Sequence, residues 1–210
     1  MSVAPLLAAA LAVCTAQDES ATPSPECRTP SAINWREAAT DDDRTRIRTG
    51  RDAWTAALDA IRARGDIAAV TAEGPLLEPD RALGSDPLPP VGDYRCRTIK
   101  LGIRDTTRAP LSVQPALPCR IAQDGELLRL TQDVGVQRVN GRFYPDTPAR
   151  GIFLGTLALG DEPLPLRYGQ DRARDLAGTV ERIATRRWRI ALPRPVFEST
   201  VDVIELTPAG

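Results

Sequence analysis

The hydrophobic period of the chain changes at a proline-rich break, "GSDPLPPVGDY", that ends any helix before residue 91. Beyond it, apolar and polar residues alternate in short runs separated by turn residues, as in half-buried β-strands. Such runs, joined mainly by short turns, predict an antiparallel meander, which can close into a barrel and remove its exposed edges. A β-sandwich is the alternative. The eight candidate strands are 93–101, 118–123, 126–132, 135–144, 150–159, 178–184, 187–192 and 201–207.

Glycines mark turns and irregularities in this half of the chain. Asp124-Gly125 and Asn140-Gly141 are dipeptides typical of two-residue hairpin turns. Gly155 lies inside a candidate strand, where glycine indicates a bend or bulge, or else room for a ligand.

A helical pattern precedes the break. Thr40 stands before three aspartates and can accept a hydrogen bond from the amide of Asp43, while Asp43 can reach back as in a capping box. Apolar residues then recur at helical spacing, and Gly65 can supply a left-handed cap. These signals predict a helix over about 41–64.

Shorter helical segments are predicted over 67–73 and from Pro79. The chain is therefore expected to be an α+β protein. A helical region, 34–85, would pack on a β-barrel domain, 91–208.

The amino-terminal end resembles an export signal. Its eleven-residue apolar run is too short to span a bilayer, which takes roughly 17–25 residues, but it suits a signal peptide over 1–16. Cys14 follows a weak lipobox, so a lipoprotein signal over 1–13 with lipid attachment at Cys14 is an alternative. A further alternative is an apolar helix of a cytosolic protein. The proline- and serine-rich segment 17–33 is predicted to be a flexible tether.

Export predicts a location in the bacterial periplasm or lipid-anchored to the envelope, with no transmembrane span in the mature chain. The composition narrows the function further. There are 27 basic and 28 acidic residues, which argues against nucleic acid as a partner. The absence of histidine excludes histidine-based triads and zinc sites, and no nucleotide-binding motif is present. We expect no metal and no cofactor.

The cysteines predict one disulfide. In an oxidising compartment spaced cysteines usually pair, and Cys96 and Cys119 lie in consecutive candidate strands that can bring their α-carbons within bonding range. The bond would stabilise the fold by roughly 3 kcal/mol on the chain-entropy model. Cys27 would remain unpaired and could mediate a dimer. Two free buried cysteines in a cytosolic protein are the alternative.

Candidate ligand-binding residues occur in three places. In strand 93–101, Tyr94 and Lys100 share a face with Cys96, and an inward Lys100 could meet a ligand anion; otherwise it pairs with a carboxylate or reaches water. Trp188 alternates with Arg187 and Arg189, which favours a core tryptophan with solvent-exposed arginines, or else a ligand-stacking ring. The loop 166–178 is either a solvated network of ion pairs or an acid–base or anion site. Its candidate residues are Arg167, Tyr168, Asp171, Arg174 and Asp175.

Four segments, "DYRCRTIKLG", "FLGTLALGDE", "RYGQDRARDLAG" and "STVDVIELTP", resemble a bacterial family catalogued as domain of unknown function 4893. The resemblance covers about 35–208 and implies an exported bacterial protein. It implies no activity, cofactor or catalytic residue. Gly92-Asp93-Tyr94 bears a looser likeness to calycin-type barrels, with tyrosine where those have tryptophan. Bacterial inhibitors of secreted metalloproteases offer an analogy to a small barrel with a disulfide.

Three hypotheses for function follow. The first is a non-enzymatic envelope protein that binds a small ligand or a protein partner in or on its barrel. The second is an inhibitor-like or assembly module that acts through its surface, with the tether 17–33 entering a partner's cleft. The third is a carboxylate-dependent hydrolase that uses Asp171 and Asp175, which requires both groups in one concave site.

Overall fold

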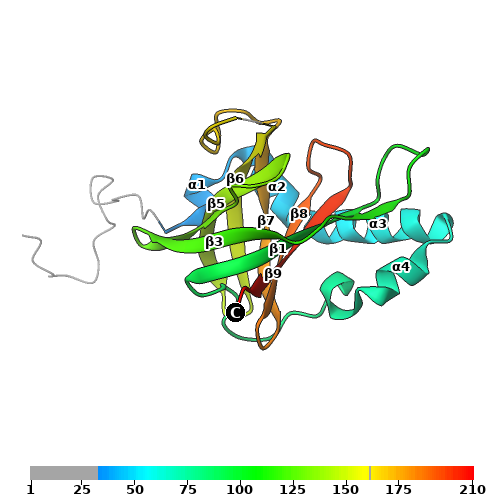
Figure 1. Cartoon of the computed structure of the whole chain (residues 1–210), viewed down its shortest axis with the longest axis horizontal. Helices are drawn as coiled ribbons and strands as arrows, with labels where there is room; N and C mark the ends of the chain where they lie inside the picture. Colours follow the sequence, from blue (N-terminus) through cyan, green and yellow to red (C-terminus); the bar gives the residue numbers. More distant parts are fainter. Residues whose placement is uncertain (1–32, 161) are drawn as a thin grey trace, which may run out of the picture.

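The structure, a computed structural model of the chain, describes residues 33–160 and 162–210 (Figure 1). The predicted signal peptide, Cys14, Cys27 and the tether up to residue 32 lie outside these ranges. The described residues form an α+β fold in which a few helices precede a sheet and pack against it.

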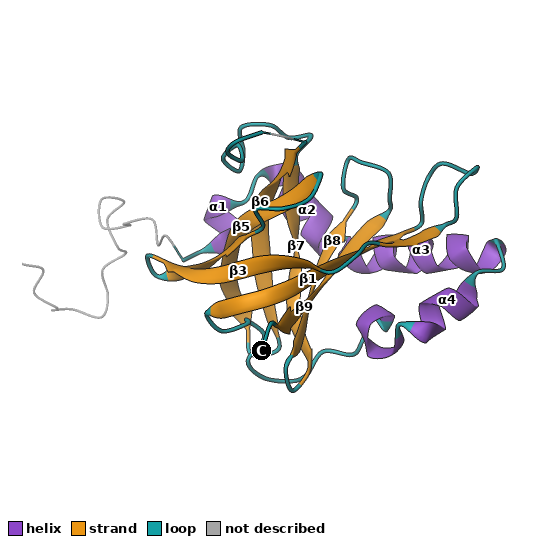
Figure 2. Ribbon diagram, in the orientation of Figure 1, coloured by secondary structure: helices purple, strands orange, loops and turns teal. Residues whose placement is uncertain are grey.

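Eight antiparallel strands close into a barrel, because the first and last of them pair with each other. Figure 2 shows the strands curving around the barrel with the helices outside it. The closure confirms the predicted barrel and excludes the β-sandwich. The strands are β1 (Gly92–Leu101), β3 (Leu117–Asp124), β4 (Leu127–Thr131), β5 (Gln137–Thr147), β6 (Arg150–Leu159), β7 (Asp175–Ala184), β8 (Arg187–Pro193) and β9 (Val201–Pro208).

A ninth strand, β2 (Leu111–Val113), was not predicted from the sequence. It pairs with the last residues of β1, whose first residues pair with β3. Pro115 lies between β2 and β3, and because proline has no amide hydrogen it interrupts the pairing along this side of β1.

The glycine predictions had mixed outcomes. Asp124-Gly125 begins the tight turn between β3 and β4, as expected. Asn140-Gly141 is not a turn, because both residues lie within β5 and Gly141 pairs with Gly155 of β6. The pairing passes through Gly155 without a register shift, so no bulge forms there. A β-carbon on either glycine would lie within 2.7 Å of Cζ of Phe153, so this glycine pair makes room for the Phe153 ring inside the barrel.

The predicted helix 41–64 is two helices. Thr40 caps the first by accepting a hydrogen bond from the amide of Asp43, as expected. The predicted return bond of the capping box is absent from the described contacts, since the Asp43 carboxylate is buried and pairs with Arg46 instead. Gly65, at φ +80°, ends the second helix. The helices are α1 (Trp35–Ala38), α2 (Asp41–Arg48), α3 (Gly50–Ala63), α4 (Ile67–Ala72) and the 3₁₀ helix η2 (Gly74–Leu77), which replaces the turn expected from Pro79.

The break between α2 and α3 allows each helix to pack on a different part of the curved barrel. Ile47 of α2 packs in a cluster with Ala177 of β7. Trp54 of α3 packs with Leu101 of β1 and Val203 of β9. The helices therefore bury apolar residues on the outer face of the strands, while a separate cluster fills part of the barrel interior.

Arg189 corrects the prediction that both arginines flanking Trp188 are exposed. Its side chain is 0% exposed, because α3 and η2 cover this face of β8. The guanidinium group donates to the carbonyls of Leu76 (3.0 Å), Glu78 (2.6 Å) and Pro79 (2.9 Å). It also pairs with Glu181 and lies 4.8 Å from the centre of the Trp54 ring. Arg187 is only half-buried and pairs with Glu205.

The predicted disulfide is present. Cys96 of β1 and Cys119 of β3 are bonded, with their α-carbons 5.9 Å apart. Both residues belong to the cluster inside the barrel, so the bond fixes the first two strands of the meander from within.

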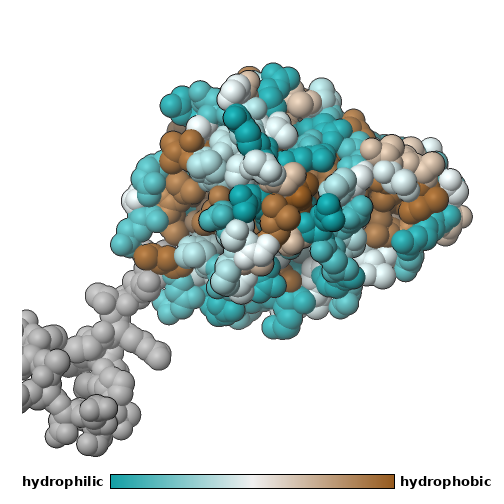
Figure 3. Space-filling view, turned by 90° about the horizontal axis from the view of Figure 1, so that it is seen from below, coloured by the Kyte–Doolittle hydropathy of each residue, from teal (hydrophilic) through white to brown (hydrophobic). Residues whose placement is uncertain are grey.

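Apolar residues are also present on the surface. Figure 3 shows the face that carries the β7–β8 turn and the carboxyl terminus, where several separate apolar patches are divided by polar residues. Scattered apolar residues of this kind are usual on soluble proteins.

Candidate functional site

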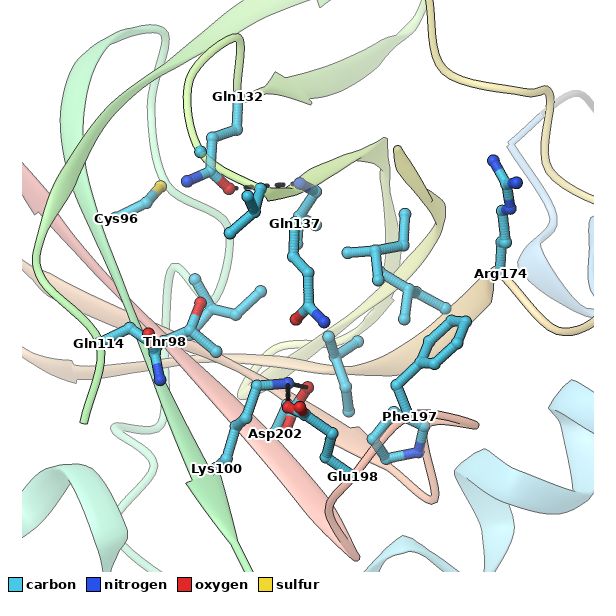
Figure 4. Close-up of a pocket in the computed structure, with 18 of the residues that line it drawn as sticks. Cys96, Thr98, Lys100, Gln114, Gln132, Gln137, Arg174, Phe197, Glu198 and Asp202 are labelled. Atoms are coloured by element: carbon cyan, nitrogen blue, oxygen red, sulfur yellow. Dashed lines mark hydrogen bonds and ion pairs between the residues drawn. The ribbon is translucent and has the colours of Figure 1, made fainter. Parts of the chain in front are cut away.

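A cavity of about 440 Å³ lies inside the barrel at the end where the long loops gather, which we call the open end (Figure 4). Its deeper wall is apolar and comes from strands on all sides of the barrel. Side chains alternate between the two faces of each strand, so the strand residues that line the cavity come from the inward-facing positions near this end of the barrel. The large apolar side chains that line this cavity include Leu117, Val139, Leu157, Leu176, Leu192, Phe197 and Ile204.

The inward face of β1 supplies one side of this cavity. Cys96, Thr98 and Lys100 all line it. The sequence predicted that these residues share a face, and it left open whether that face is inside. Thr98 and Lys100 lie at successive inward positions toward the open end, so the wall becomes more polar along β1.

Lys100 is the centre of a buried ionic cluster. It is only 4% exposed, and its ammonium nitrogen lies 3.3 Å from Oδ2 of Asp202 and 3.4 Å from Oε2 of Glu198. The hydroxyl of Ser199 donates to the other oxygen of Asp202. Arg108 pairs with Glu198 from the outer side at 3.2 Å. One buried cation is therefore held between two carboxylates at the rim of an apolar cavity.

The two carboxylates differ in their surroundings. Burial raises the pKa of Asp202, and the nearby Lys100 charge only partly opposes this shift. Burial also acts on Glu198, but the charges of Lys100 and Arg108 outweigh it and lower the pKa of that group. Glu198 therefore remains an anion near the surface, whereas Asp202 is the group of the cluster that takes up a proton more readily than usual.

Loops at the open end form the entrance to the cavity. Val136, in the β4–β5 loop, lines the cavity although it is 79% exposed. The cavity therefore reaches the protein surface at this loop. In the β8–β9 loop, Phe197 packs against the barrel core. Arg194 and Glu198 of that loop have φ of +49° and +61°, a left-handed conformation that non-glycine residues seldom adopt.

Uncharged polar side chains complete the lining. Gln132 accepts a hydrogen bond from the amide of Val139 and is thereby fixed in place. Figure 4 shows the side-chain amide of Gln137 extending toward the Lys100 cluster, and Thr98 and Gln114 lie to the left of it in this view. These groups could donate to or accept from the polar end of a ligand.

The candidate loop 166–178 is divided between several surroundings. Arg174 lines the cavity and pairs with Glu162 and Asp171. Asp175 is buried and accepts from the amide of Gly169, while burial raises its pKa. Asp171 accepts from the amide of Ala173. Neither carboxylate lines the cavity, so the structure does not bring them together in one concave site.

Arg167 and Tyr168 lie outside the barrel. The Tyr168 hydroxyl donates to Asp43 and accepts from the amide of Thr40, which anchors the loop to the start of α2. Burial and the adjacent Asp43 raise the pKa of Tyr168. Both residues line a separate groove on the outer surface.

Tyr94 and Trp188 lie away from the cavity. Their rings meet edge to face, 6.2 Å apart, inside the barrel near its other end. The Tyr94 hydroxyl donates to the carbonyl of Pro90 at 2.8 Å, and burial raises the pKa of Tyr94. The core interpretation of Trp188 is confirmed by its burial.

Asp202, Glu198 and Ser199 are functional candidates that were not predicted from the sequence. One signal was available for Asp202, because it precedes Ile204 and Leu206 at a spacing of two and so belongs to the inward stripe of β9. A carboxylate at such a position needs a partner. The loop geometry that brings Glu198 to Lys100 has no comparable sequence signal.

Among residues 33–160 and 162–210, no group of three His, Cys, Asp or Glu side chains is placed to hold a metal ion. No helix within the same ranges has both the length and the apolar character needed to cross a membrane.

A family model described as "Domain of unknown function (DUF4893)" matches residues 35–206. The match covers the helices and nearly the whole barrel. No curated protein and no solved structure matches the chain significantly.

Proposed function

The chain belongs to the DUF4893 family, and since that family's description names no activity, we propose from the site itself that the protein binds a small amphipathic molecule inside its barrel. The apolar body of the ligand would lie against the deep wall, and its polar end would lie at the Lys100 cluster. We further propose that it does so in the cell envelope after export, on the strength of the apolar run and small residues at its amino-terminal end.

The cavity is the single observation that carries this proposal. An eight-stranded barrel is either filled by its own side chains or has room for one small ligand. Here about 440 Å³ remains, within the range of roughly 300–1,000 Å³ common for small-molecule sites. A mostly apolar lining with a few convergent polar groups is also usual for such sites.

The arrangement supports binding better than catalysis. Ser199 is fully buried and its hydroxyl donates to Asp202, so it is not placed to attack a ligand. Asp171 and Asp175, the pair required by the hydrolase hypothesis, lie outside the cavity lining. The tether-insertion hypothesis rests on residues 17–33, of which the structure describes only Ile33.

A fluorescence titration with anilinonaphthalene sulfonate tests the proposal, because this probe has an apolar body and one anionic group. We expect saturable binding with one site per chain. Leu157→Trp, which fills the cavity from β6, should weaken binding at least tenfold, equivalent to about 1.4 kcal/mol. Val91→Trp adds the same ring at an exposed position outside the cavity and should bind like the unaltered protein.

Thermal unfolding of each variant provides the necessary control, since a partly unfolded chain also binds this probe. If Leu157→Trp unfolds at a similar temperature and still binds the probe as tightly as the unaltered protein, the cavity is not the site and the proposal is wrong.

A further inference from the structure

A second concave surface lies on the outside of the barrel. It is a groove of about 610 Å³ between the outer faces of β4, β5 and β6 and the segment 165–168. It shares no lining residue with the barrel cavity. Leu154, Leu166 and Tyr144 give it some apolar wall, and the rest is polar.

Positive charge is concentrated in this groove. Arg129, Arg142 and Arg167 line it. Asp124 pairs with Arg129 at 2.6 Å and with Arg142 at 2.7 Å through one carboxylate oxygen, and these pairs lower its pKa. Arg167 makes no ion pair with any residue that the structure describes. Three guanidinium groups thus face one carboxylate, an excess of two positive charges.

The other acids close to the groove do not offset this excess fully. Asp43, which accepts from the Tyr168 hydroxyl, is already paired with Arg46. Asp175 is buried and accepts from the amide of Gly169, next to Tyr168 in the chain, and burial and the Asp43 charge raise its pKa. Neither carboxylate lines the groove.

Thr156 supplies an independent observation. It lines the groove, is 3% exposed, and its hydroxyl oxygen has no hydrogen-bond partner among the described residues. Directly across the strand pair is Asn140, also buried, whose side-chain amide makes one long bond of 3.3 Å to the carbonyl of Arg138. Buried hydroxyls in folded proteins are nearly always hydrogen-bonded, so the unpaired Thr156 hydroxyl indicates a bonding partner beyond the described residues.

We propose that this groove is a second binding site, which takes a small molecule bearing a phosphate or carboxylate group. Guanidinium groups match both oxyanions in geometry, because each can donate two parallel hydrogen bonds. Arg129 and Arg142 keep N–H donors beyond those used on Asp124. The hydroxyl of Thr156 and the amide of Asn140 bind the polar groups next to the anion. The segment 165–168 covers one side of it.

The test is a titration of ¹⁵N-labelled protein with inorganic phosphate and, separately, with citrate, followed by amide chemical shifts. We expect saturable shifts around residues 140–142 and 154–156, and the tighter of the two probes identifies the preferred anion. Arg142→Gln should weaken binding of that probe at least fivefold. Arg120→Gln removes a guanidinium group from an exposed ion pair with Asp93 outside the groove, and it should bind like the unaltered protein.

Thr156→Val gives the sharpest test, because it keeps the shape of the side chain and removes only the orphan hydroxyl. The unliganded variant should unfold at the same temperature or higher, while its affinity for the anion falls severalfold. Equal affinity for Thr156→Val and the unaltered protein, or equal losses for Arg142→Gln and Arg120→Gln, would overturn the proposal. The result is independent of the barrel cavity, since these variants should leave binding of anilinonaphthalene sulfonate unchanged.

Discussion

The two ends of the barrel are built differently. At one end the strands are joined by tight turns at 125–126, 148–149 and 185–186, and the Tyr94–Trp188 ring pair fills the interior. The segment 84–91 crosses this end, where Tyr94 and Trp188 donate to the carbonyls of Pro90 and Asp86. We call it the closed end.

The open end has longer connections, among them 102–110, 132–136 and 194–200. It holds the cavity, the Lys100 cluster and two non-glycine residues in left-handed conformation. The difference suggests a division of roles, in which one end of the barrel provides stability and the other provides the proposed binding cavity. Packed rings and tight turns hold the strands together at one end, and the other end carries buried charge and empty space at a cost in stability.

The largest effect is expected where the closed half of the barrel meets the helices. Arg189→Met removes the hydrogen bonds to the carbonyls around η2 and leaves Glu181 without its partner. Loss of one member of a buried ion pair typically costs about 3–5 kcal/mol, and we expect a decrease of that size in the free energy of unfolding. Urea denaturation followed by tryptophan fluorescence measures it.

Two controls sharpen this prediction. Arg120→Met removes an exposed arginine and should change the free energy of unfolding by less than about 1 kcal/mol. Arg189→Met/Glu181→Leu removes both charges and should recover part of the loss. A loss below about 1 kcal/mol for Arg189→Met would contradict the view that Arg189 joins the helices to the barrel.

At the open end, Lys100→Met is expected to cost less and to depend on pH. The variant leaves Asp202 buried without its cation, a loss of about 2–3 kcal/mol near pH 7. Burial already raises the pKa of Asp202, and loss of Lys100 removes the charge that opposes this rise. A carboxyl whose pKa is higher in the folded state binds a proton there more readily than in the unfolded chain, so its contribution to stability falls as pH rises.

The stability difference between Lys100→Met and the unaltered protein should therefore shrink as pH is lowered from 8 toward the ordinary Asp range. Denaturation curves across this range measure the difference. Lys100→Met/Asp202→Asn should be more stable than Lys100→Met at pH 8 and should show a weaker pH dependence. A pH-independent difference would mean that Asp202 does not titrate in the variant.

How far the sequence predicts the molecule also differs between the ends. Alternating hydrophobicity located all eight barrel strands to within a few residues, because burial on one side of a strand leaves a period of two. The Cys96–Cys119 pair, in the first two barrel strands, followed from spacing along adjacent strands. The three-residue β2 was too short to show a period.

The open-end cluster could be predicted only in part. The sequence placed Lys100 on the face of Cys96, but its partners come from a loop and strand about 100 residues later. Asn140-Gly141 misled for a related reason, since these residues fit a local turn pattern, whereas pairing with β6 and the nearby ring of Phe153 account for a glycine within the strand. Arg189 was expected in water because nothing local shows that η2 would cover it. Local sequence patterns therefore predict the helices and strands, whereas contacts between distant parts of the chain determine which side chains form the Lys100 cluster.

The smallest effect concerns backbone conformation at the two ends. Asp86 at the closed end and Arg194 at the open end both have positive φ, +52° and +49°. Aspartate tolerates this conformation better than arginine, because its short polar side chain bonds locally. Arg194→Gly should therefore raise the free energy of unfolding more than Asp86→Gly, each by less than about 1 kcal/mol after the entropy cost of glycine.

Neither variant should alter the packing of the closed end, but Arg194→Gly also frees the β8–β9 loop from its contact with Thr49. We expect it to speed association and dissociation of anilinonaphthalene sulfonate in stopped-flow measurements, with Asp86→Gly unchanged. Equal binding kinetics for the two variants would show that this loop does not control entry to the cavity.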